Sequence, residues 1–143
     1  MSLPPTFAKD FHREEDVKRM EYQQLGKTHM MVSKISIGGG TLCDMAYGKL
    51  DFDEAKKTVI EALKRGINYI DTAPYYGNGE SELNVGKILK EVPRQAFYIA
   101  TKVCRYERTG QGQFDFGYER TMRSVNESLG RLGLSYIDLY QLH

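Results

Sequence analysis

The chain has 143 residues, of which 41% are hydrophobic and 27% are charged, a composition typical of one globular domain rather than a disordered chain. Twenty Lys and Arg against nineteen Asp and Glu give a formal net charge of +1. No stretch gathers Lys and Arg densely enough for a nucleic-acid-binding surface, so we expect neither DNA nor RNA as a partner.

Targeting signals and cysteine content indicate the cellular compartment to expect. No apolar run approaches the roughly 18 residues that a membrane helix needs, and residues 1–20 lack the apolar core of a secretory signal. Cys43 and Cys104 are the two cysteines of the chain, and their separation matches no metal-ligand spacing. Without either targeting pattern, we expect a cytoplasmic protein with no membrane partner. Because thiols stay reduced in the cytosol, we also expect no disulfide.

Residues 1–33 divide into a polar leader and a hairpin. Residues 1–20 are charged and lack an apolar stripe, which predicts a mobile leader. Two strand-like runs, Met20–Leu25 and Met30–Ser33, flank a four-residue connection that contains Gly26, which is the pattern of a hairpin. We expect this hairpin to plug one end of a barrel, and residues 21–143 to form one domain.

From Lys34 onward, strand patterns alternate four times with helix or turn patterns, which favours parallel βα units. The predicted strands are 34–38, 68–71, 96–102 and 136–142, and the apolar run of the last predicts burial on both faces. A capping box at Asp51 and Glu54 starts the first helix, which carries Ala55, Val59, Ala62 and Leu63 on one side and ends at Gly66. The second helix starts near Ser81 and is expected to bury Leu83, Val85, Ile88 and Leu89, and the third carries Met122, Val125, Leu129 and Leu132 up to Gly133.

Three reactive side chains fall at the carboxyl ends of successive predicted strands. Asp71, Lys102 and His143 end the second, third and fourth strands, where parallel sheets and barrels gather their reactive groups. An open dinucleotide-binding sheet would show G-x-G-x-x-G at the start of its first helix. Here Gly38-Gly39-Gly40 lacks the third glycine and precedes the helix by more than ten residues. The pattern therefore favours a TIM-type α/β barrel, of which these would be the first four βα units.

These residue types suit proton and hydride transfer at a carbonyl. A tyrosine with a pKa of about 10 is a poor proton donor at neutral pH, so a nearby cation must stabilise its phenolate. Lys102 is the candidate cation for Tyr76, and Asp71 can supply the anion that keeps a buried lysine charged. His143 can orient a carbonyl or alcohol by a hydrogen bond while a nicotinamide moves the hydride. The scheme requires no metal, and three histidines are too few for a histidine-rich metal site.

Each candidate also has a purely structural interpretation. Asp71 alone reads as a strand-end cap, Lys102 as a solvated charge and His143 as a C-terminal residue, whereas the set of four favours chemistry. The glycine run either turns the chain tightly or contacts a cofactor. The residues Arg105, Tyr106, Phe114, Phe116 and Tyr118 form either a sugar-binding loop or, as we favour, a solvated loop with a few packed rings.

Several motifs resemble the aldo-keto reductases. They are Asp71-Thr72-Ala73-Pro74-Tyr75-Tyr76-Gly77 with Ser81-Glu82, then Ala100-Thr101-Lys102, and finally Leu139-Tyr140-Gln141-Leu142-His143. Within that family, Thr101 to Tyr106, Phe114-Asp115-Phe116 and Glu119-Arg120 resemble the L-galactose dehydrogenase-like branch, which oxidises a sugar at its anomeric carbon.

The resemblance implies a role for each site residue. Tyr76 would be the proton donor or acceptor, Lys102 and Asp71 would tune it, and Tyr76 and His143 would contact the substrate. The nicotinamide end of NADP or NAD would lie against Gly40, Thr41, Leu42 and Asp71. The substrate would be a sugar or a small carbonyl or alcohol compound.

The resemblance also sets an expectation about completeness. An eight-stranded barrel normally needs about 250 residues, so this chain corresponds to the N-terminal half, with weak or no activity alone. Open strand edges would invite self-association. The alternative is a catalytically silent regulatory or interaction protein built on a half barrel, like the channel subunits that resemble these enzymes.

Overall fold

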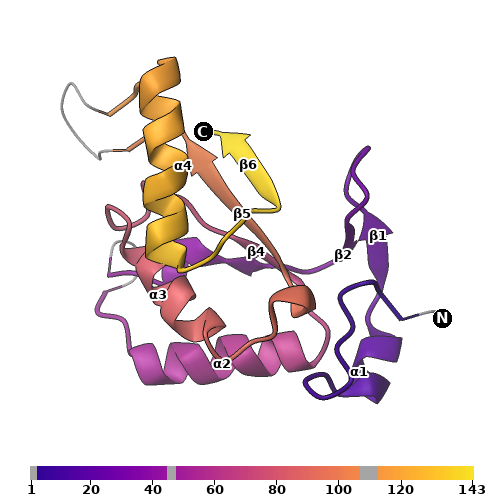
Figure 1. Ribbon diagram of the computed structural model, residues 1–143. Coiled ribbons are helices and arrows are strands. Elements are labelled where there is room, and N and C mark those ends of the chain that lie inside the picture. The colour runs from indigo at the N-terminus through magenta and orange to yellow at the C-terminus, as the bar shows by residue number, and fades with distance from the viewer. Residues whose placement is uncertain (1–2, 45–47, 107–112) are drawn as a thin grey trace.

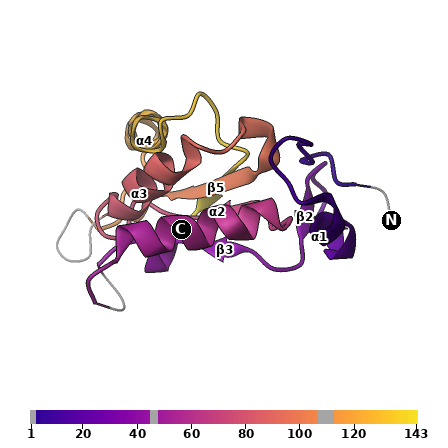
Figure 2. The ribbon, with the colours of Figure 1, turned by 90° about the horizontal axis from the view of Figure 1, so that it is seen from below.

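The computed structural model describes residues 3–44, 48–106 and 113–143, and its centre is a four-stranded parallel sheet. The strands are β3 (Ile37–Gly38), β4 (Tyr69–Asp71), β5 (Tyr98–Val103) and β6 (Leu139–Leu142), in that spatial order. Helices α2 (Phe52–Lys64), α3 (Glu80–Leu89) and α4 (Tyr118–Leu132) connect them and lie along one side of the sheet (Figures 1 and 2). Two short 3-10 helices, η1 (Gly39–Thr41) and η2 (Arg94–Ala96), follow β3 and precede β5. The predicted βα order is confirmed, with strands shorter than expected.

Local signals in the sequence explain where α2 begins and where α4 ends. The Asp51 side chain accepts a hydrogen bond from the Glu54 backbone N–H over 3.1 Å, as the capping box predicts for the start of α2. Helix α4 ends at Gly133, whose φ of +66° is the left-handed cap that glycine adopts without strain. The first residue of α4 is Tyr118.

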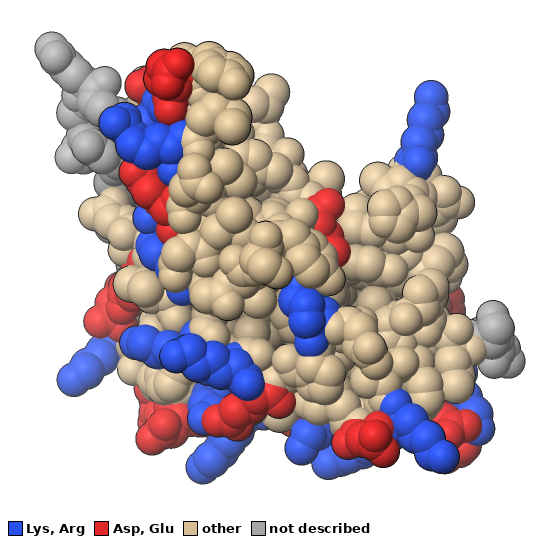
Figure 3. Space-filling view, in the orientation of Figure 1, with Lys and Arg blue, Asp and Glu red and all other residues tan. Residues whose placement is uncertain are grey.

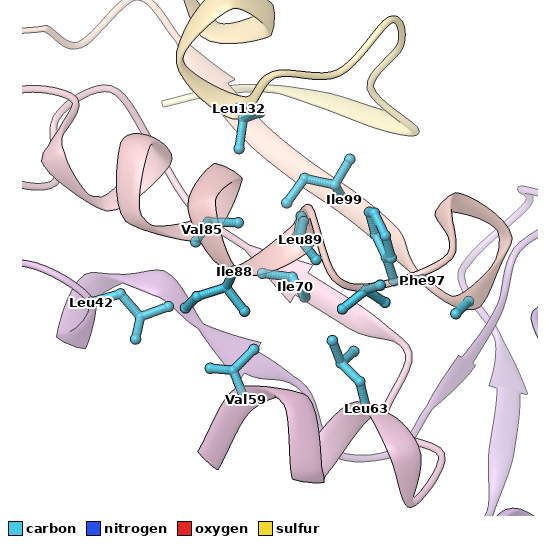
Figure 4. Close-up of a cluster of buried hydrophobic side chains, with 12 residues drawn as sticks. Leu42, Val59, Leu63, Ile70, Val85, Ile88, Leu89, Phe97, Ile99 and Leu132 are labelled. Carbon is cyan, nitrogen blue, oxygen red and sulfur yellow. The ribbon is translucent and has the colours of Figure 1, made fainter. Parts of the chain in front are cut away.

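The hydrophobic core lies between the helices and the outer face of the sheet (Figure 4). Leu63 of α2, Ile88 of α3 and Ile99 of β5 are completely buried, and Ile70 and Leu132 are 1% exposed. Burial of a side chain of this size stabilises the fold by about 1.5–3 kcal/mol. Because side chains alternate along a strand, the neighbours of Ile70 and Ile99 project to the opposite face, where Asp71 lies.

Two predicted faces differ from the structure. Leu83 and Met122 are each 46% exposed, because α3 turns Ser81 and Glu82 inward and α4 turns Ser124 and Ser128 inward. The prediction that the last strand is buried on both faces is wrong for the described residues. Strand β6 lies at the edge of the sheet with β5 as its one strand neighbour, and Leu142 is 80% exposed.

The N-terminal segment packs against the domain, which differs from the predicted mobile leader. Residues 1 and 2 of that prediction lie outside the described residues, but 3–20 include helix α1 (Glu14–Arg19). Val17 is 1% exposed and faces Gly66, where an added Cβ would lie 3.2 Å from Val17. The Arg13 backbone N–H also donates to Lys64 O over 2.8 Å. One apolar residue per turn is enough for a six-residue helix, so no stripe was visible.

The predicted hairpin is confirmed as the antiparallel pair β1 (Tyr22–Gln24) and β2 (Met31–Ser33). Asn68, fully buried just before β4, fixes its position: Asn68 Oδ1 accepts from the Ser33 N–H, and Asn68 Nδ2 donates to Met31 O. The hairpin therefore joins the sheet at the amino end of β4, opposite the end that carries Asp71.

The surface divides into charged and uncharged parts. In the space-filling view, Lys, Arg, Asp and Glu gather along the lower margin over α1 and α2, whereas the area between α4 and the hairpin is mostly uncharged (Figure 3). Beside the free edge of β3, a cavity of about 440 Å³ is lined by Ile37, Leu42, Ala55, Val59 and Ala62, among others. Within the described residues, no helix is both long and apolar enough to cross a membrane.

Candidate active site

The carboxyl end of the sheet brings Asp71, Lys102 and Tyr76 into direct contact. Lys102 Nζ lies 2.6 Å from Asp71 Oδ2, 3.0 Å from Thr72 O and 3.2 Å from Tyr76 Oη. Asp71 ends β4 and Lys102 lies on β5, and the parallel register pairs Asp71 with Ala100. Since Ala100 and Lys102 are two residues apart, both project to the face that carries Asp71. The register therefore places this lysine beside the carboxylate.

Tyr76 reaches the lysine from the loop between β4 and α3. The loop turns through Gly77, Asn78 and Gly79, all with positive φ, before α3 begins. At Gly77 an added Cβ would lie 2.8 Å from Cys43 Cβ, so both the backbone angle of +62° and the available space require glycine. The Ser81 N–H donates to Tyr76 O over 3.2 Å and holds the loop against the start of α3.

Buried polar contacts fix the start of α3 to the sheet. Ser81 Oγ donates to Gly39 O over 2.6 Å and lies 2.8 Å from Thr72 Oγ1. Glu82, completely buried, accepts from Thr101 Oγ1 and from Arg131 Nε, each over 2.6 Å. These contacts join α3 to β5 and α4 at the level of the site. The Ser81-Glu82 motif therefore supports the loop that carries Tyr76.

His143 completes the group at the end of β6. Its backbone N–H donates to Val103 O over 3.0 Å, and its ring meets the Tyr76 ring edge to face at a centroid distance of 6.2 Å. Burial lowers the pKa of His143 from its ordinary value of 6.5, as do the charges of Lys102 and Arg105, against an opposing effect of Asp71. These effects together favour the neutral form of the ring. Its Nδ1 is buried and has no hydrogen-bond partner among the described residues.

Gln141 belongs to the site, although no role was predicted for it. Gln141 Nε2 donates to Asp71 Oδ1 over 2.8 Å, so β5 and β6 each hold one oxygen of this carboxylate. Gln141 lies two residues before His143, and alternate residues along a strand project to the same face of the sheet. This spacing could have placed Gln141 in the site from the sequence.

The glycine segment predicted to face a nicotinamide follows β3 directly. Gly38 is the register partner of Asp71, and the space where a Cβ would lie is open at both Gly38 and Gly40. Thr41 is exposed, whereas the Leu42 side chain is 5% exposed and packs in the hydrophobic core.

The aromatic residues after β5 are mainly solvent-facing. Phe116 and Tyr118 are 67% and 74% exposed, whereas Tyr106 is 9% exposed and lies beneath the Arg120 guanidinium. Cys43 and Cys104 are buried and unpaired. No group of His, Cys, Asp or Glu within the described part of the chain could hold a metal ion.

The chain was compared with known proteins by sequence and by fold. The sequence model of the Aldo/keto reductase family matches residues 34–143. The chain is 42% identical over 127 residues to an L-galactose dehydrogenase from Arabidopsis thaliana. The alignment covers 87% of this chain and 38% of that protein. It is 36% identical over 134 residues to an NADH-specific methylglyoxal reductase from Escherichia coli, covering 83% of this chain and 40% of that protein.

A solved structure gives the same result. An aldo-keto reductase from Bacillus halodurans, in its holo form, superimposes with a TM-score of 0.73 at 40% identity, over 87% of this chain and 40% of that one. The chain thus spans about two fifths of the length of these relatives. The fold is the corresponding part of a TIM barrel, and the chain belongs to the aldo/keto reductase family.

Proposed function

We propose that this chain carries the proton-transfer centre of an NAD(P)-dependent oxidoreductase that acts on a sugar or a small carbonyl or alcohol compound, in the manner of L-galactose dehydrogenase. The observation that supports this most strongly is the position of Lys102 Nζ, within 3.2 Å of Tyr76 Oη and 2.6 Å of Asp71 Oδ2. A lysine that contacts both a phenol and a carboxylate is the arrangement expected around an acid–base tyrosine, whereas a purely structural salt bridge would not need the phenol.

Tyr76 transfers the proton in this proposal. In sugar oxidation, the phenolate oxygen takes the hydroxyl proton; in carbonyl reduction, the phenol returns a proton to the carbonyl oxygen. The Lys102 ammonium stabilises the phenolate, while Asp71 and Thr72 O hold that ammonium in place. Tyr76 Oη accepts a hydrogen bond from Lys102 Nζ, which fixes the position of the oxygen that exchanges the proton with the substrate.

His143 orients the substrate. Its lowered pKa favours the neutral ring, which can donate one hydrogen bond to a substrate oxygen without adding charge to the site. The ring lies edge to face with both Tyr75 and Tyr76, at centroid distances of 5.8 and 6.2 Å, which restricts its rotation. A substrate oxygen held by His143 would therefore lie beside the Tyr76 hydroxyl.

The nicotinamide end of NADP or NAD would lie against Gly40, Thr41, the Leu42 backbone and Asp71. The open space at Gly38 and Gly40 supports this placement, as does the register pairing of Gly38 with Asp71. When bound, the cofactor supplies the hydride acceptor for oxidation and, in its reduced form, the hydride for reduction. The site residues position the reacting carbon and manage the proton.

Cofactor affinity and activity of the isolated 143-residue chain are expected to be weak. Barrels commonly bind phosphate through the loops after strands seven and eight, and the chain matches about two fifths of its relatives. We infer a cytoplasmic location from the family chemistry and from two unpaired, buried cysteines.

Self-association through the sheet edges is a further part of the proposal. Among the described residues, β3 and β6 each have one strand neighbour, and unpaired edges of this kind bind other strands. Sedimentation velocity over a range of concentrations tests this. A single 16.4 kDa species at every concentration would contradict it.

The direct test of the enzyme function is turnover by the purified chain. L-galactose and NAD or NADP are incubated with the chain at high concentration, and reduced cofactor is measured. We expect slow formation of reduced cofactor that requires the sugar. Tyr76→Phe should abolish it while the circular dichroism spectrum stays unchanged, and Tyr75→Phe is the matched control because it removes the neighbouring hydroxyl.

A further inference from the structure

The contacts that hold the four proposed site residues together are all made within the chain. Tyr76 Oη lies 3.2 Å from Lys102 Nζ, which lies 2.6 Å from Asp71 Oδ2. His143 joins the group through its ring, at a centroid distance of 6.2 Å from the Tyr76 ring. The carboxyl ends of three neighbouring strands and the loop after β4 therefore assemble the proton-transfer centre.

Tyr76 and His143 each offer one polar atom to a substrate. The Tyr76 side chain is half-buried, and its Oη is held at Lys102. Within the described residues, Nδ1 of His143 is buried without a partner, so Nε2 is the ring nitrogen that can reach a ligand. The charges of Lys102 and Asp71 both affect the pKa of His143, which places this ring beside the same ion pair as Tyr76. A molecule bound at the Tyr76 hydroxyl therefore also borders His143.

These two groups can move protons in opposite directions without a change in the net charge of the site. Burial lowers the pKa of His143 and favours its neutral form, which can accept a proton. Tyr76 can donate one, because the phenolate that results lies beside the Lys102 ammonium. The imidazolium formed at His143 is attracted in turn to Asp71, whose charge raises the pKa of that ring. Paired proton transfer of this kind is general acid–base catalysis and needs no electron acceptor.

The interconversion of sugar anomers is a reaction that requires proton transfer alone. When the ring of an aldose opens, a base removes the proton of the anomeric hydroxyl, and the electron pair released forms the carbonyl bond. The bond from the anomeric carbon to the ring oxygen breaks, and that oxygen takes a proton from an acid. Rotation of the carbonyl group followed by the reverse steps gives the other anomer. Both protons return to the groups that held them, and no carbon is oxidised or reduced.

We propose that the chain catalyses the mutarotation of small aldoses without a cofactor, with Tyr76 as the acid toward the ring oxygen and His143 as the base toward the anomeric hydroxyl. Both oxygens are bonded to one carbon, so two adjoining proton-transfer groups can serve them together. The inference goes beyond the proposed function because no hydride moves, and it rests on that function for the acid–base role of Tyr76. Weak cofactor affinity of the 143-residue chain would not limit this reaction.

Polarimetry in the absence of cofactor tests the proposal. Freshly dissolved α-L-galactose and α-D-galactose mutarotate at the same rate in buffer, because they are mirror images, and each is followed at increasing concentrations of the full chain. We expect the rate to rise in proportion to chain concentration and by different amounts for the two sugars, since a folded site distinguishes mirror images. No acceleration of either sugar would overturn the proposal, and so would equal acceleration of both, which indicates catalysis by exposed side chains.

Variants assign the activity to the two groups. Tyr76→Phe, with a native circular dichroism spectrum, should reduce the rate added by the chain at least about a hundredfold, as expected when a general acid is removed. His143→Gln should reduce it to a similar extent. The matched controls are Tyr118→Phe and His29→Gln, which change exposed side chains of the same types and should keep the native rate. An unchanged rate in either Tyr76→Phe or His143→Gln would refute the assignment.

The same measurements separate this inference from the proposed function. Mutarotation that requires Tyr76, in a chain that forms no reduced cofactor, would support this inference and leave the oxidoreductase proposal without support. Reduced cofactor formed from L-galactose with no acceleration of mutarotation would support the oxidoreductase proposal and overturn this inference.

Discussion

The side-chain amide of Gln141 donates to Asp71 Oδ1 over 2.8 Å, while Lys102 holds the other oxygen of the same carboxylate. Asp71 and Gln141 are seventy residues apart and lie on strands that are not neighbours, since β5 separates β4 from β6. The Asp71 carboxylate therefore links three strands at the site, and its orientation toward Lys102 depends on β6.

Gln141→Met removes this amide and keeps a side chain of similar length. Loss of a hydrogen bond to a charged group costs about 1.5–3 kcal/mol, and partial exposure of Asp71 favours the lower end of that range. We expect a lower free energy of unfolding in urea denaturation and reduced turnover. Gln23→Met, at an exposed position of β1, should leave both unchanged. Equal stability of the Gln141 variant and the native chain would show that Lys102 alone orients the carboxylate.

Gly77→Ala tests how the Tyr76 loop is held. The added methyl would lie 2.8 Å from Cys43 Cβ at a φ of +62°, so we expect a loss of about 1–3 kcal/mol of stability and a displaced Tyr76. Gly130→Ala is the control, because its Cβ would meet open space within α4, where alanine stabilises a helix by about 0.8–1 kcal/mol over glycine. Thermal denaturation of both variants measures the two effects, which should have opposite signs.

The buried pair of Glu82 and Arg131 should be coupled energetically. Glu82→Leu leaves the Arg131 guanidinium without its carboxylate, and breaking such a pair costs about 3–5 kcal/mol. Arg131→Met leaves the completely buried Glu82 carboxylate with the Thr101 hydroxyl as its remaining side-chain partner among the described residues. The double variant should be less destabilised than the sum of the single changes, with a coupling free energy of about 1–3 kcal/mol. Strict additivity in urea denaturation would contradict a direct interaction.

Stability should decrease as the pH falls below neutral. Burial lowers the pKa of both His12 and His143 below 6.5 in the folded chain, so the unfolded chain binds more protons in this range. The free energy of unfolding should therefore fall as the pH drops through 6.5 toward the lowered pKa values, and level off below them with respect to these two groups. Urea denaturation at a series of pH values from about 8 down to about 5 measures this change in the free energy of unfolding. His12→Gln should flatten part of the slope, and an unchanged slope would assign the effect to other groups.

The elements predicted from the sequence were those with strong local signals. The capping box at Asp51, the end of the third helix at Gly133 and the Gly-containing hairpin all depend on neighbouring residues, and all three are present. The contact of Asp71 with Lys102 was also predictable, because both residues lie at the carboxyl ends of predicted parallel strands.

Long-range pairing explains what was missed. Glu82 reads as a solvated helix residue until Arg131, forty-nine residues later, lies against it, and its burial turns Leu83 outward. The folding of residues 3–20 onto the domain depends on the space above Gly66, which no local pattern of that segment reveals. Gln141 lacked a role because its partner lies on a strand two positions away in the sheet.

The most direct test of the central claim, that Tyr76 transfers the proton, is reduction of NAD or NADP by the full chain with L-galactose, compared between the native sequence and Tyr76→Phe. General acid–base catalysis by a side chain is worth about a hundred to ten-thousandfold in rate, so the variant should fall by at least about a hundredfold while Tyr75→Phe does not. Equal rates in the native chain and Tyr76→Phe would contradict the claim.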